Sequence, residues 1–585
     1  MNGFLSTLAT IWRLAIPYFR SEDRVMGRIL LAAVVSIELA IVGINVLLNQ
    51  WNARFYNALQ ERAWDAFVRE LSVFCLLAAT FIVFAVYQLY LNQWLQIRWR
   101  RFLTQRYLGE WLDRGTHYRM QLTGDAADNP DQRIAEDIKQ FIDGGANGVG
   151  ILPMGLGLLN AIVTLGSFVF ILWGLSDAAP LTLGGWSIPG YLVWAALIYA
   201  IIGTLLTHLI GRPLTALNFN QQHYEADFRF DLVRARENSE QIALLHGEGA
   251  ERERLSGRFE AVAENWIRIM KRTKQLTFLT VSYRQISNVF PIVVVSPVYF
   301  AGKMQLGGLT QTSSAFSEVQ GALSFFINVY RAFAEWRAVI ARLAGFEDAI
   351  LVARAIGVTT PAIKLAATHA AQVRLDDLNV ALPDGQPLVS ADGIAIAPRD
   401  QVLVTGASGA GKSTLFRAIA GIWPFGRGTV SLPAGAKVMT LPQRPYLPIG
   451  TLAAAVSYPA VAGTFDEARI RDLLVAVGLP ALAKRTAEEG HWNRMLSLGE
   501  QQRIAIARAI LHAPDYLLLD EASASLDEPA EAALYRLLHD RLPNAAIVSI
   551  GHRSTLAAFH KRRLTLTREG ERHRVAEAAL NPASA

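Results

Sequence analysis

A glycine-rich stretch in the C-terminal third of the chain reads Gly406-Ala407-Ser408-Gly409-Ala410-Gly411-Lys412-Ser413-Thr414. It follows a short apolar run, residues 401–405, and opens a helix-like stretch, residues 415–420. A strand, a glycine-rich turn and a helix form the context in which G-x-x-x-x-G-K-[ST] indicates a phosphate-binding loop. Glycines let backbone N–H groups turn toward an anion, and the helix N-terminus adds its positive end. The stretch therefore predicts a loop that binds a nucleoside triphosphate, which we take to be ATP.

Two side chains of this loop have expected roles, and a second stretch complements them. We expect Lys412 to lie between the outer phosphates and Ser413 to place its hydroxyl on Mg²⁺. Residues 516–521 form an apolar run that ends in two carboxylates. Paired acids after a strand can merely cap a helix, but beside a phosphate loop they favour catalysis. We expect Asp520 to hold Mg²⁺ and Glu521 to polarise the attacking water.

Composition bounds the class of protein. With 585 residues the chain is too long for one core, so two or more domains are expected. Hydrophobic residues make up 52% of the chain and charged residues only 18%. This composition is more apolar than that of an ordinary soluble protein and is closer to that of a membrane protein. The single cysteine, Cys75, excludes an intrachain disulfide and argues against a cysteine-based metal site. No basic patch interleaved with aromatics forms a compact domain, so we expect no nucleic-acid partner.

Six stretches approach the ~20 apolar residues that cross ~30 Å of hydrocarbon. They are residues 29–48, 71–91, 151–175, 188–210, 276–299 and 314–340. The last two carry Arg284, Glu318, Arg331 and Glu335. Because charges in lipid are expensive, we expect these two spans to border a water-filled path.

The distribution of arginine and lysine predicts the orientation. The link after the second span contains Arg98, Arg100, Arg101 and Arg106, and the link after the fourth is also rich in Arg and Lys. By contrast, the third-to-fourth link has only Asp177 as a charged residue, and the fifth-to-sixth link has only Lys303. The positive-inside rule therefore places both termini in the cytoplasm, on the side where ATP is available.

These patterns divide the chain into four parts. Residues 1–25 are predicted to hold an interfacial amphipathic helix rather than a signal peptide, and residues 26–349 a transmembrane domain of six helices that extend into the cytoplasm. Residues 350–372 are rich in Ala and Thr and read as a linker. Residues 373–585 alternate short β-rich runs with helices, as in an α/β domain with a largely parallel sheet. The predicted fold is a polytopic α-helical membrane domain with six spans, fused to an α/β P-loop ATPase domain.

Further motifs carry a resemblance to a known family. The stretch Leu496-Ser497-Leu498-Gly499-Glu500-Gln501-Gln502-Arg503 resembles the signature motif of ATP-binding-cassette proteins. Gln443 matches the Q-loop of that family, the tripeptide 525–527 matches the D-loop, and His552 matches the switch histidine. All six motifs occur in the family's order over about residues 373–570. The resemblance implies an ATPase coupled to transport, with Glu521, His552 and Gln443 in catalysis and Gln443 beside Ser413 and Asp520 at Mg²⁺.

The resemblance also implies a partner. In this family two cassettes pair head to tail, and one cassette with six spans resembles a half-transporter of exporter-like architecture. A second copy of the same chain is the simplest partner. Ser497 and Gly499, with the helix beginning near Glu500, would then meet the γ-phosphate of ATP held by the other copy. Asp527, from the D-loop, would join the nucleotide site. Hydrolysis would remove this bridge, and the cytoplasmic helices would pass the movement to the membrane path.

The chain departs from the family pattern at two places. Leu498 and Glu500 replace a glycine and the glutamine of the common signature, but the positions expected to touch phosphate remain. The aromatic residue that usually stacks on adenine falls at Leu382, just before the turn at 383–385. Since base–aromatic stacking is worth roughly 1–3 kcal/mol, we expect Leu382 to hold adenine less tightly.

The membrane half narrows the resemblance to a subgroup. Residues 129–134, 225–230 and 237–243 look like those of the bacterial YddA and BacA-related group. The membrane domain of that group is similar to that of SbmA/BacA peptide importers and of the subfamily D acyl-CoA transporters. Taken without this resemblance, residues 237–248 form only a charged amphipathic helix turn.

The favoured function is an ATP-driven transporter of the bacterial inner membrane that imports peptides, including antimicrobial peptides, or other large hydrophilic solutes. Glu38, Glu318 and Glu335 would suit a cationic cargo if they face a cavity, although Glu38 would equally pair with a neighbouring helix. A lipid or acyl-CoA transporter of the subfamily D type is the alternative. A membrane ATPase that senses peptide stress and signals through a partner is a second alternative. Six predicted spans exclude a soluble cassette protein.

Overall fold

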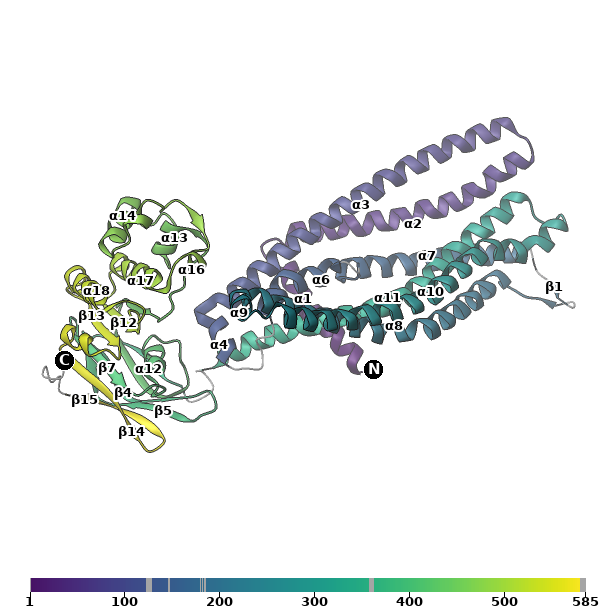
Figure 1. Cartoon of the computed structure of the whole chain (residues 1–585). Coiled ribbons are helices and arrows are strands. Elements are labelled where there is room, and N and C mark those ends of the chain that lie inside the picture. The colour runs from purple at the N-terminus through teal and green to yellow at the C-terminus, as the bar shows by residue number, and fades with distance from the viewer. Residues whose placement is uncertain are drawn as a thin grey trace. The chain divides into compact units, whose positions relative to one another are not determined.

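The computed structural model describes residues 2–122, 129–145, 148–178, 180, 182–183, 186–356 and 362–578. The chain forms two compact units (Figure 1). The helical unit comprises Met1–Leu108 and Asn129–Ala344, and the sheet unit comprises Gly109–Asp128 and Gly345–Ala585.

The helical unit is built from long helices. They are α1 (Asn2–Arg20), α2 (Arg24–Gln60), α3 (Trp64–Leu112), α7 (Ile151–Ala178), α8 (Tyr191–Glu237), α10 (Glu248–Phe300) and α11 (Leu306–Ala355). Short elements connect them: α5 (Pro130–Gln132), the π-helical turn η2 (Arg133–Asp137), α6 (Ile138–Asp143), α9 (Ser239–Leu244) and the two-residue strands β1 (Thr182–Leu183) and β2 (Trp186–Ser187). Helices α3 and α11 continue into the sheet unit.

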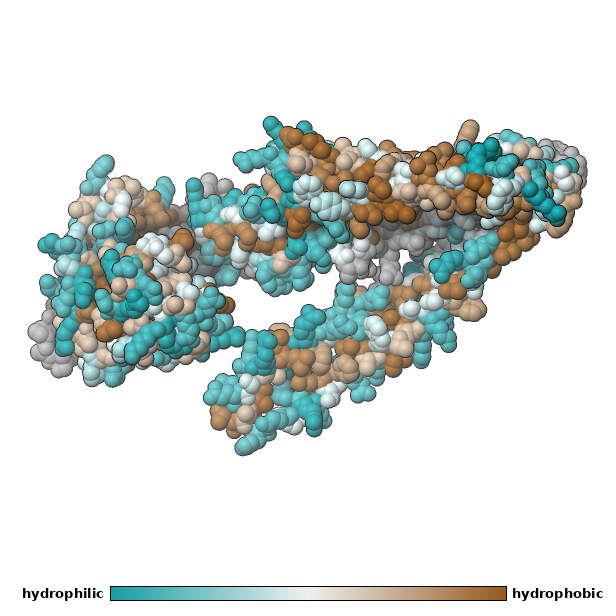
Figure 2. Space-filling view, turned by 90° about the horizontal axis from the view of Figure 1, so that it is seen from above, coloured by the Kyte–Doolittle hydropathy of each residue, from teal (hydrophilic) through white to brown (hydrophobic). Residues whose placement is uncertain are grey.

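Several of these helices have the length and composition of membrane spans. Among the described residues five qualify: α2, the stretch Trp64–Leu122, α7, α8 and α10. The predicted sixth span falls on α11, which is not among the five because polar residues such as Gln311, Glu318 and Gln320 interrupt it. Apolar side chains cover long stretches of the helical unit's surface (Figure 2). Apolar patches of this extent are unusual on soluble proteins and suit contact with lipid.

A polar seam joins the end of α2 to the start of α11. The N–H groups of Leu306 and Gly307 donate to Gln60 Oε1 and Asn57 Oδ1, each at 2.8 Å. These N–H groups belong to the first turn of a helix, which has no acceptor of its own, so α2 supplies the N-terminal cap of α11. The backbones approach closely here, because a Cβ atom on Gly307 would lie only 2.0 Å from the carbonyl oxygen of Ala53.

A buried ion cluster holds the middle of α11. Arg342 donates to both carboxylate oxygens of Asp137, at 2.9 and 2.7 Å, and Arg133 donates to the same carboxylate at 2.7 Å. Asp137 is fully buried. Close by, the indole N–H of Trp336 donates to the carbonyl of Phe141 at 3.1 Å. Together these contacts fasten η2 and α6 to α11.

The sheet unit contains one large mixed sheet. Its strands are β3 (Lys364–Thr368), β4 (Val373–Ala381), β5 (Pro387–Ala391), β6 (Ile394–Ile396), β7 (Gln401–Gly406), β8 (Gly426–Pro433), β9 (Val438–Leu441), β12 (Tyr516–Asp520), β13 (Ala546–Ile550), β14 (Arg562–Glu569) and β15 (Arg572–Ala578). The strand order is β3-β8-β4-β5-β15-β14-β7-β13-β12-β9, and β6 pairs with β4. A small hairpin, β10 (Gly450–Thr451) with β11 (Glu489–Gly490), stands apart from this sheet.

The sheet is parallel only in part. Strands β14, β7, β13, β12 and β9 run parallel to their neighbours in this half. Strand β4 pairs antiparallel with β5, β6 and β8, and β14 pairs antiparallel with β15. Strand β5 also pairs parallel with β15, and β3 with β8, so most pairings among the described strands are parallel, as predicted, and the antiparallel ones involve β4 or the β14–β15 hairpin. Short connections such as the turn at 382–386 favour hairpins in the other half, because a parallel crossover needs a dozen or more residues.

Alternating side chains bury both faces of the parallel half. On one face Leu517, Leu519 and Ile547 pack with helices α13 (Leu452–Ser457), α14 (Glu467–Ala476), α17 (Leu498–His512) and α18 (Glu528–Arg541). On the other face Leu518 and Val548 pack with α12 (Lys412–Ile419). Shorter helical segments complete the unit: α15 (Pro480–Ala483), α16 (Trp492–Met495) and the 3₁₀ turn η4 (Ser554–Phe559).

Two further segments belong to the sheet unit. The 3₁₀ turn η1 (Asp113–Gly115) and α4 (Thr116–Leu122) follow α3, and Leu122 packs against the core beside α12. The range 350–372, which we predict to be a linker, contains the last residues of α11 and strand β3, which pairs with β8.

Replacing Gly307 by alanine tests the close approach of α2 and α11. We expect Gly307→Ala to lower the stability of the helical unit by a few kcal/mol, because the atom in the way is backbone and cannot rotate aside. Gly321→Ala on the same helix is the matched control, since a Cβ there meets nothing within 4 Å. Thermal unfolding of the purified protein, followed by tryptophan fluorescence, measures both variants. Equal unfolding temperatures for the two variants would contradict the packing described.

Candidate nucleotide-binding and hydrolysis site

The predicted phosphate loop connects β7 to α12. Gly411 occupies the N-cap position of α12 with φ +89°, a left-handed conformation that glycine adopts without strain. A Cβ atom there would also lie 2.5 Å from Val389 Cγ2 on β5. The loop therefore needs glycine at this position for two reasons. The backbone N–H groups that follow Gly411 belong to the first turn of α12, and the N-terminus of a helix is a site where anions bind.

Lys412 is folded onto the loop. Its side chain is buried, and Nζ donates to the carbonyl oxygens of Gly406 and Ala407, each at 2.9 Å. Burial lowers the pKa of Lys412, while the carboxylates of Glu521 and Asp520 act in the opposite direction. The lysine thus brings a positive charge to the loop at the place where phosphates are expected.

Ser413 and Asp520 form the predicted metal pair. The hydroxyl of Ser413 donates to Asp520 Oδ1 at 2.8 Å. Burial raises the pKa of Asp520, and the hydrogen bond from Ser413 partly opposes this rise. A hydroxyl and a carboxylate are the hard oxygen ligands that Mg²⁺ prefers, so the residues present fit this ion. A bound cation would supply positive charge that favours the ionised form of Asp520.

Three residues are predicted to act in catalysis, and two of them, Gln443 and His552, contact the third, Glu521. Gln443 Nε2 donates to Glu521 Oε2 at 3.1 Å, and His552 Nε2 lies 3.2 Å from Glu521 Oε1. The backbone of Glu521 has φ +52°, which is uncommon for a residue other than glycine, asparagine or aspartate. Backbone strain of this kind clusters at functional sites, where the surroundings hold it in place. The arrangement fixes the carboxylate through both of its oxygens.

The parallel strands explain why these residues meet. Asp520 at the end of β12 pairs with Ile550 at the end of β13, and Ile550 pairs with Val404 near the end of β7. The segments after these three strands carry Glu521, His552 and the phosphate loop. Ligand sites of open α/β sheets lie outside the carboxyl ends of parallel strands, and this site follows the rule.

The signature stretch begins helix α17. Ser497 is its N-cap residue and accepts a hydrogen bond from the N–H of Glu500 at 3.3 Å, while Glu500 Oε2 accepts from the N–H of Ser497 at 2.9 Å. This reciprocal pair is a capping box, which S-x-x-E sequences form. The glutamate that replaces the usual glutamine therefore serves its own helix terminus.

The signature residues do not bond to the phosphate loop of their own chain. Among the described residues no hydrogen bond or ion pair joins Ser497 or Gly499 to residues 406–414. Gly499 instead borders the D-loop, since a Cβ there would lie 3.3 Å from the carbonyl oxygen of Ser525. Asp527 caps helix α18 by accepting from the N–H of Ala530 at 3.2 Å.

Gln502 links two of the predicted loops, a role that the sequence did not reveal. Its side chain is fully buried. Nε2 donates to the carbonyl of Gln443 at 3.0 Å, and Oε1 accepts from the N–H of Ser525 at 3.1 Å. A buried glutamine must satisfy both ends of its amide, and here the Q-loop and the D-loop supply the two partners.

Arg553 was also missed, although it directly follows the switch histidine. Its guanidinium donates to the carbonyl oxygens of Leu526 at 2.7 Å and Ala524 at 3.2 Å. It also lies 3.5 Å from the buried carboxylate of Glu531 on α18. The segment that holds His552 is thereby tied to the D-loop.

Leu382 occupies a tight turn before β5. Its N–H donates to the carbonyl of Gln386 at 2.8 Å, and its own carbonyl accepts from the N–H of Gly385 at 2.9 Å. The side chain is half-buried and packs against the same core as Leu388, which lies beside Gly411. The side chain at the position predicted to face adenine therefore packs against the core of the sheet unit.

Comparisons with known proteins identify the family of both parts of the chain. The ABC transporter transmembrane region 2 family matches residues 14–300, and the ABC transporter family matches residues 393–524. The inner membrane ABC transporter ATP-binding protein YddA of Escherichia coli is 33% identical over 92% of this chain and 93% of its own. The chloroplastic ABC transporter D family member 2 of Arabidopsis thaliana is 32% identical over 96% of this chain and 87% of its own.

More distant relatives extend the comparison. The mouse lysosomal cobalamin transporter ABCD4 is 26% identical over 94% of this chain and 92% of its own. The structure of a bacterial Atm1-family ABC exporter with ATP bound superposes with a TM-score of 0.69, at 18% identity, over 94% of this chain and 95% of that one. This likeness confirms the predicted exporter-like architecture.

The matched regions also define the kind of transporter. One transmembrane region precedes one ATP-binding domain, which is the composition of a half-transporter, and the ATP-binding domain implies an ATPase coupled to transport. Relatives at or above 32% identity include a D family member. The chain therefore belongs to the ABC transporter family, as a membrane-embedded half-transporter with D-family relatives.

Proposed function

We propose that two copies of this chain form an ATP-driven transporter of a bacterial inner membrane that imports peptides, including antimicrobial peptides, or other large hydrophilic solutes. The location is supported by the relative YddA, which is named as an inner membrane protein. The distribution of Arg and Lys supports cytoplasmic termini. The observation that carries the ATP-driven step is the carboxylate of Glu521, held between Gln443 and His552.

In this proposal Glu521 is the residue that polarises the attacking water. One of its oxygens must accept a proton or a hydrogen bond from that water, while Gln443 and His552 keep the carboxylate in place. Ser413, Asp520 and Gln443 would hold Mg²⁺, which would stabilise negative charge on the phosphates. Lys412 would contact the outer phosphates, and Asp527 would take part from the D-loop.

A second copy is required because each site lacks part of its donors. Ser497 and Gly499 lie at the N-terminus of α17, which is suited to bind a phosphate, yet they border the D-loop rather than the phosphate loop of their own chain. Pairing two sheet units head to tail would bring each signature stretch to the nucleotide of the other. ATP would then act as a removable link between the two copies.

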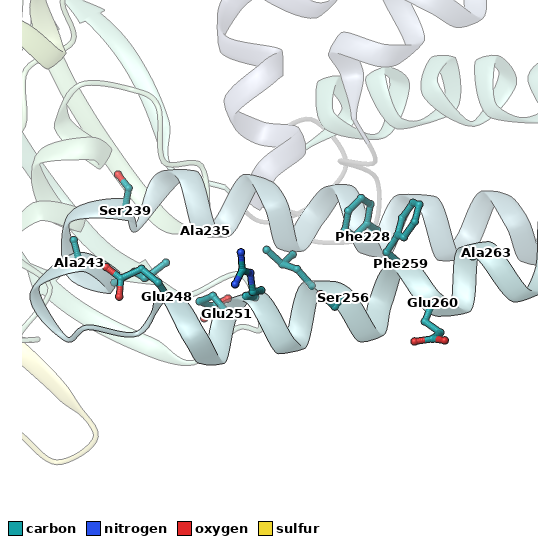
Figure 3. A pocket seen from close by; sticks show the side chains of 13 residues that line it. Phe228, Ala235, Ser239, Ala243, Glu248, Glu251, Ser256, Phe259, Glu260 and Ala263 are labelled. Carbon is teal, nitrogen blue, oxygen red and sulfur yellow. The ribbon is translucent and has the colours of Figure 1, made fainter.

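The ends of α8 and α10 that are connected through α9 are suited to transmit the movement of the sheet units to the spans. These helices pack side by side, with the rings of Phe228 and Phe259 facing each other at 5.5 Å between centroids (Figure 3). A cleft of about 900 Å³ lies between them next to α9. At the end of α9, Leu244 and the C-cap residue Leu245 are 72% and 81% exposed. We propose that this end receives the sheet unit of the other copy and transfers its displacement to the spans.

The acidic residues expected to attract a cationic cargo differ in their surroundings. Glu38 accepts hydrogen bonds from Gln88 on α3 and from Asn160 on α7, so it pairs with neighbouring helices. Glu335 lies outside the described side chains. Glu318, on α11, is half-buried and forms no hydrogen bond or ion pair with another described residue. If α11 borders the solute path, the unpartnered carboxylate of Glu318 would suit a cationic peptide cargo.

Transport of a lipid or an acyl-CoA is the second candidate. Its support is the D family relative, together with the long apolar surface of the helical unit. This candidate requires an apolar path and predicts that lipids, rather than peptides, stimulate ATP hydrolysis. With such a cargo, the carboxylate of Glu318 would have no positive charge on the cargo to pair with.

Glu521→Gln tests the catalytic assignment. We expect the variant to bind ATP but to hydrolyse it about 100-fold more slowly or worse, because an amide cannot accept the proton of the attacking water. Glu528→Gln is the matched control, since Glu528 is exposed in the first turn of α18. Steady-state phosphate release by the purified protein measures both. Hydrolysis by Glu521→Gln at the parental rate would assign the water to another residue.

Leu382→Tyr tests the adenine platform. We expect the Kd for ATP to fall by roughly fivefold or more, because stacking on an aromatic ring contributes roughly 1–3 kcal/mol. Leu365→Tyr, on the exposed side of β3, controls for the added ring alone. Calorimetric titration of nucleotide into the full-length protein compares the two. Weaker or unchanged binding by Leu382→Tyr would remove residue 382 from the adenine site.

Proteoliposomes test the cargo. We expect ATP-dependent movement of a labelled cationic peptide, reduced severalfold by Glu318→Gln and preserved by Glu318→Asp, which keeps the charge. A neutral peptide of equal length controls for charge. Movement of labelled lipid or acyl-CoA without peptide flux would favour the second candidate. ATP hydrolysis with no solute flux at all would identify a sensor rather than a transporter.

A further inference from the structure

An apolar cleft of about 560 Å³ lies in the helical unit between α1, α2 and α7. Its volume falls in the range of about 300–1,000 Å³ typical of pockets that hold small molecules. The walls are formed by aliphatic and aromatic side chains, among them Trp12, Ile16, Leu31, Val35, Leu156 and Leu159. Trp99 of α3 also lines the cleft, and its ring stacks on Tyr18 of α1 at 5.4 Å between centroids.

Two arginines belong to the same cleft. Arg20 and Arg28 line it, and neither forms an ion pair with another described residue. Within the part of the chain that the structure describes, the guanidinium of Arg28 donates only to the carbonyl oxygen of Phe19, at 2.9 Å, and meets no carboxylate.

The acids near these arginines do not neutralise them. Asp23 is engaged elsewhere, since Arg98 Nε donates to it at 2.9 Å and the hydroxyl of Tyr18 donates at 3.1 Å. Glu22 is exposed and does not line the cleft. The cleft therefore joins a long apolar wall to a pair of free positive charges.

We propose that this cleft binds one anionic phospholipid, with its phosphate on Arg20 and Arg28 and an acyl chain along the apolar wall. Guanidinium groups bind phosphate oxygens in pairs, which favours a phosphate over other anions. Trp12 is 68% exposed at the cleft, as expected of a tryptophan at the membrane interface. The bound lipid would hold α1 against α2 and α7. The inference does not depend on which solute the protein transports.

Charge complementarity distinguishes this occupant from a helix of a second copy. An apolar helix would fill the wall but would bring no anion to the two exposed guanidinium groups. A phospholipid satisfies the wall and the charges at once. A headgroup with net negative charge satisfies them better than a zwitterionic one, whose own ammonium group competes with the arginines.

Photo-crosslinking in proteoliposomes tests the assignment. The probe is a phosphatidylglycerol that carries a diazirine in its acyl chain, and the labelled peptides are identified by mass spectrometry. We expect labels on residues of α1, α2 and α7 that line the cleft. The double change Arg20→Gln with Arg28→Gln should reduce this labelling by roughly fivefold or more, the order expected on losing two charge-assisted contacts. Arg24→Gln, an exposed arginine outside the cleft, should leave labelling unchanged.

A second pair of variants tests the apolar wall without touching a charge. Gly155 lines the cleft and Gly166 lies on the same helix outside it, and a Cβ on either meets nothing within 4 Å. Gly155→Leu should therefore fill the cleft and exclude the acyl chain, whereas Gly166→Leu should not. Size-exclusion chromatography and parental ATP hydrolysis establish that each variant is folded.

Three outcomes would overturn the proposal. Equal labelling by the phosphatidylcholine analogue would show that the charges do not select the lipid. Displacement of the lipid by inorganic phosphate at moderate concentration would identify a plain anion site. Crosslinks from the cleft to a second copy of the chain, in place of lipid, would identify a helix as the occupant. Failure of peptide transport bears on none of these readouts, so the two proposals are tested separately.

Discussion

The parallel pairing of β7, β13 and β12 is the constraint on which the hydrolysis site depends. These strands place their carboxyl ends at one edge of the sheet, so the phosphate loop, His552 and the acidic pair emerge together. Their pairing registers are fixed by alternating side chains that bury both faces, because a shift by one residue would turn every side chain to the wrong face. The position of Glu521 is therefore set by the packing of residues such as Leu517 and Leu518, which lie in the core on opposite faces of the sheet.

Buried polar links turn the separate loops into one unit. Gln502 joins the backbone of the Q-loop to that of the D-loop, and Arg553 joins the switch segment to the D-loop. In each case the partner is a backbone atom, so the loop cannot move away without exposing an unsatisfied carbonyl or N–H group. The strained backbone of Glu521 is held in place by the same surrounding loops. Displacement of the D-loop by a second copy would thus reach Gln443 and His552, the two residues that hold the carboxylate.

The sequence predicted the residues with motif chemistry but not those that connect them. Strand, loop and helix around Lys412 follow from local pattern alone, and the acidic pair after β12 follows from an apolar run that ends in charge. Gln502 and Arg553 act through backbone atoms 59 and 27 positions away, which leave no mark on local sequence. The antiparallel pairing of β4 with β8 was missed for the same reason, since these two strands are distant in the sequence. Glu500 differs from these residues, because the capping box that it forms with Ser497 follows from a local S-x-x-E pattern that can be recognised in the sequence.

The acidic residues of the helical unit separate into two groups by the same reasoning. Polar groups in a span must find partners, because lipid offers none. Glu38 finds amides on two neighbouring helices, and Asp137, which lies outside the spans in η2, finds two guanidinium groups, so both serve the packing of the bundle. Helix α11 is capped by α2 at its start and held by Asp137 through Arg342, which leaves the stretch that contains Glu318 fixed at both ends. The half-buried carboxylate of Glu318 has no hydrogen bond or ion pair within the described chain, so it does not join the helices as Glu38 and Asp137 do.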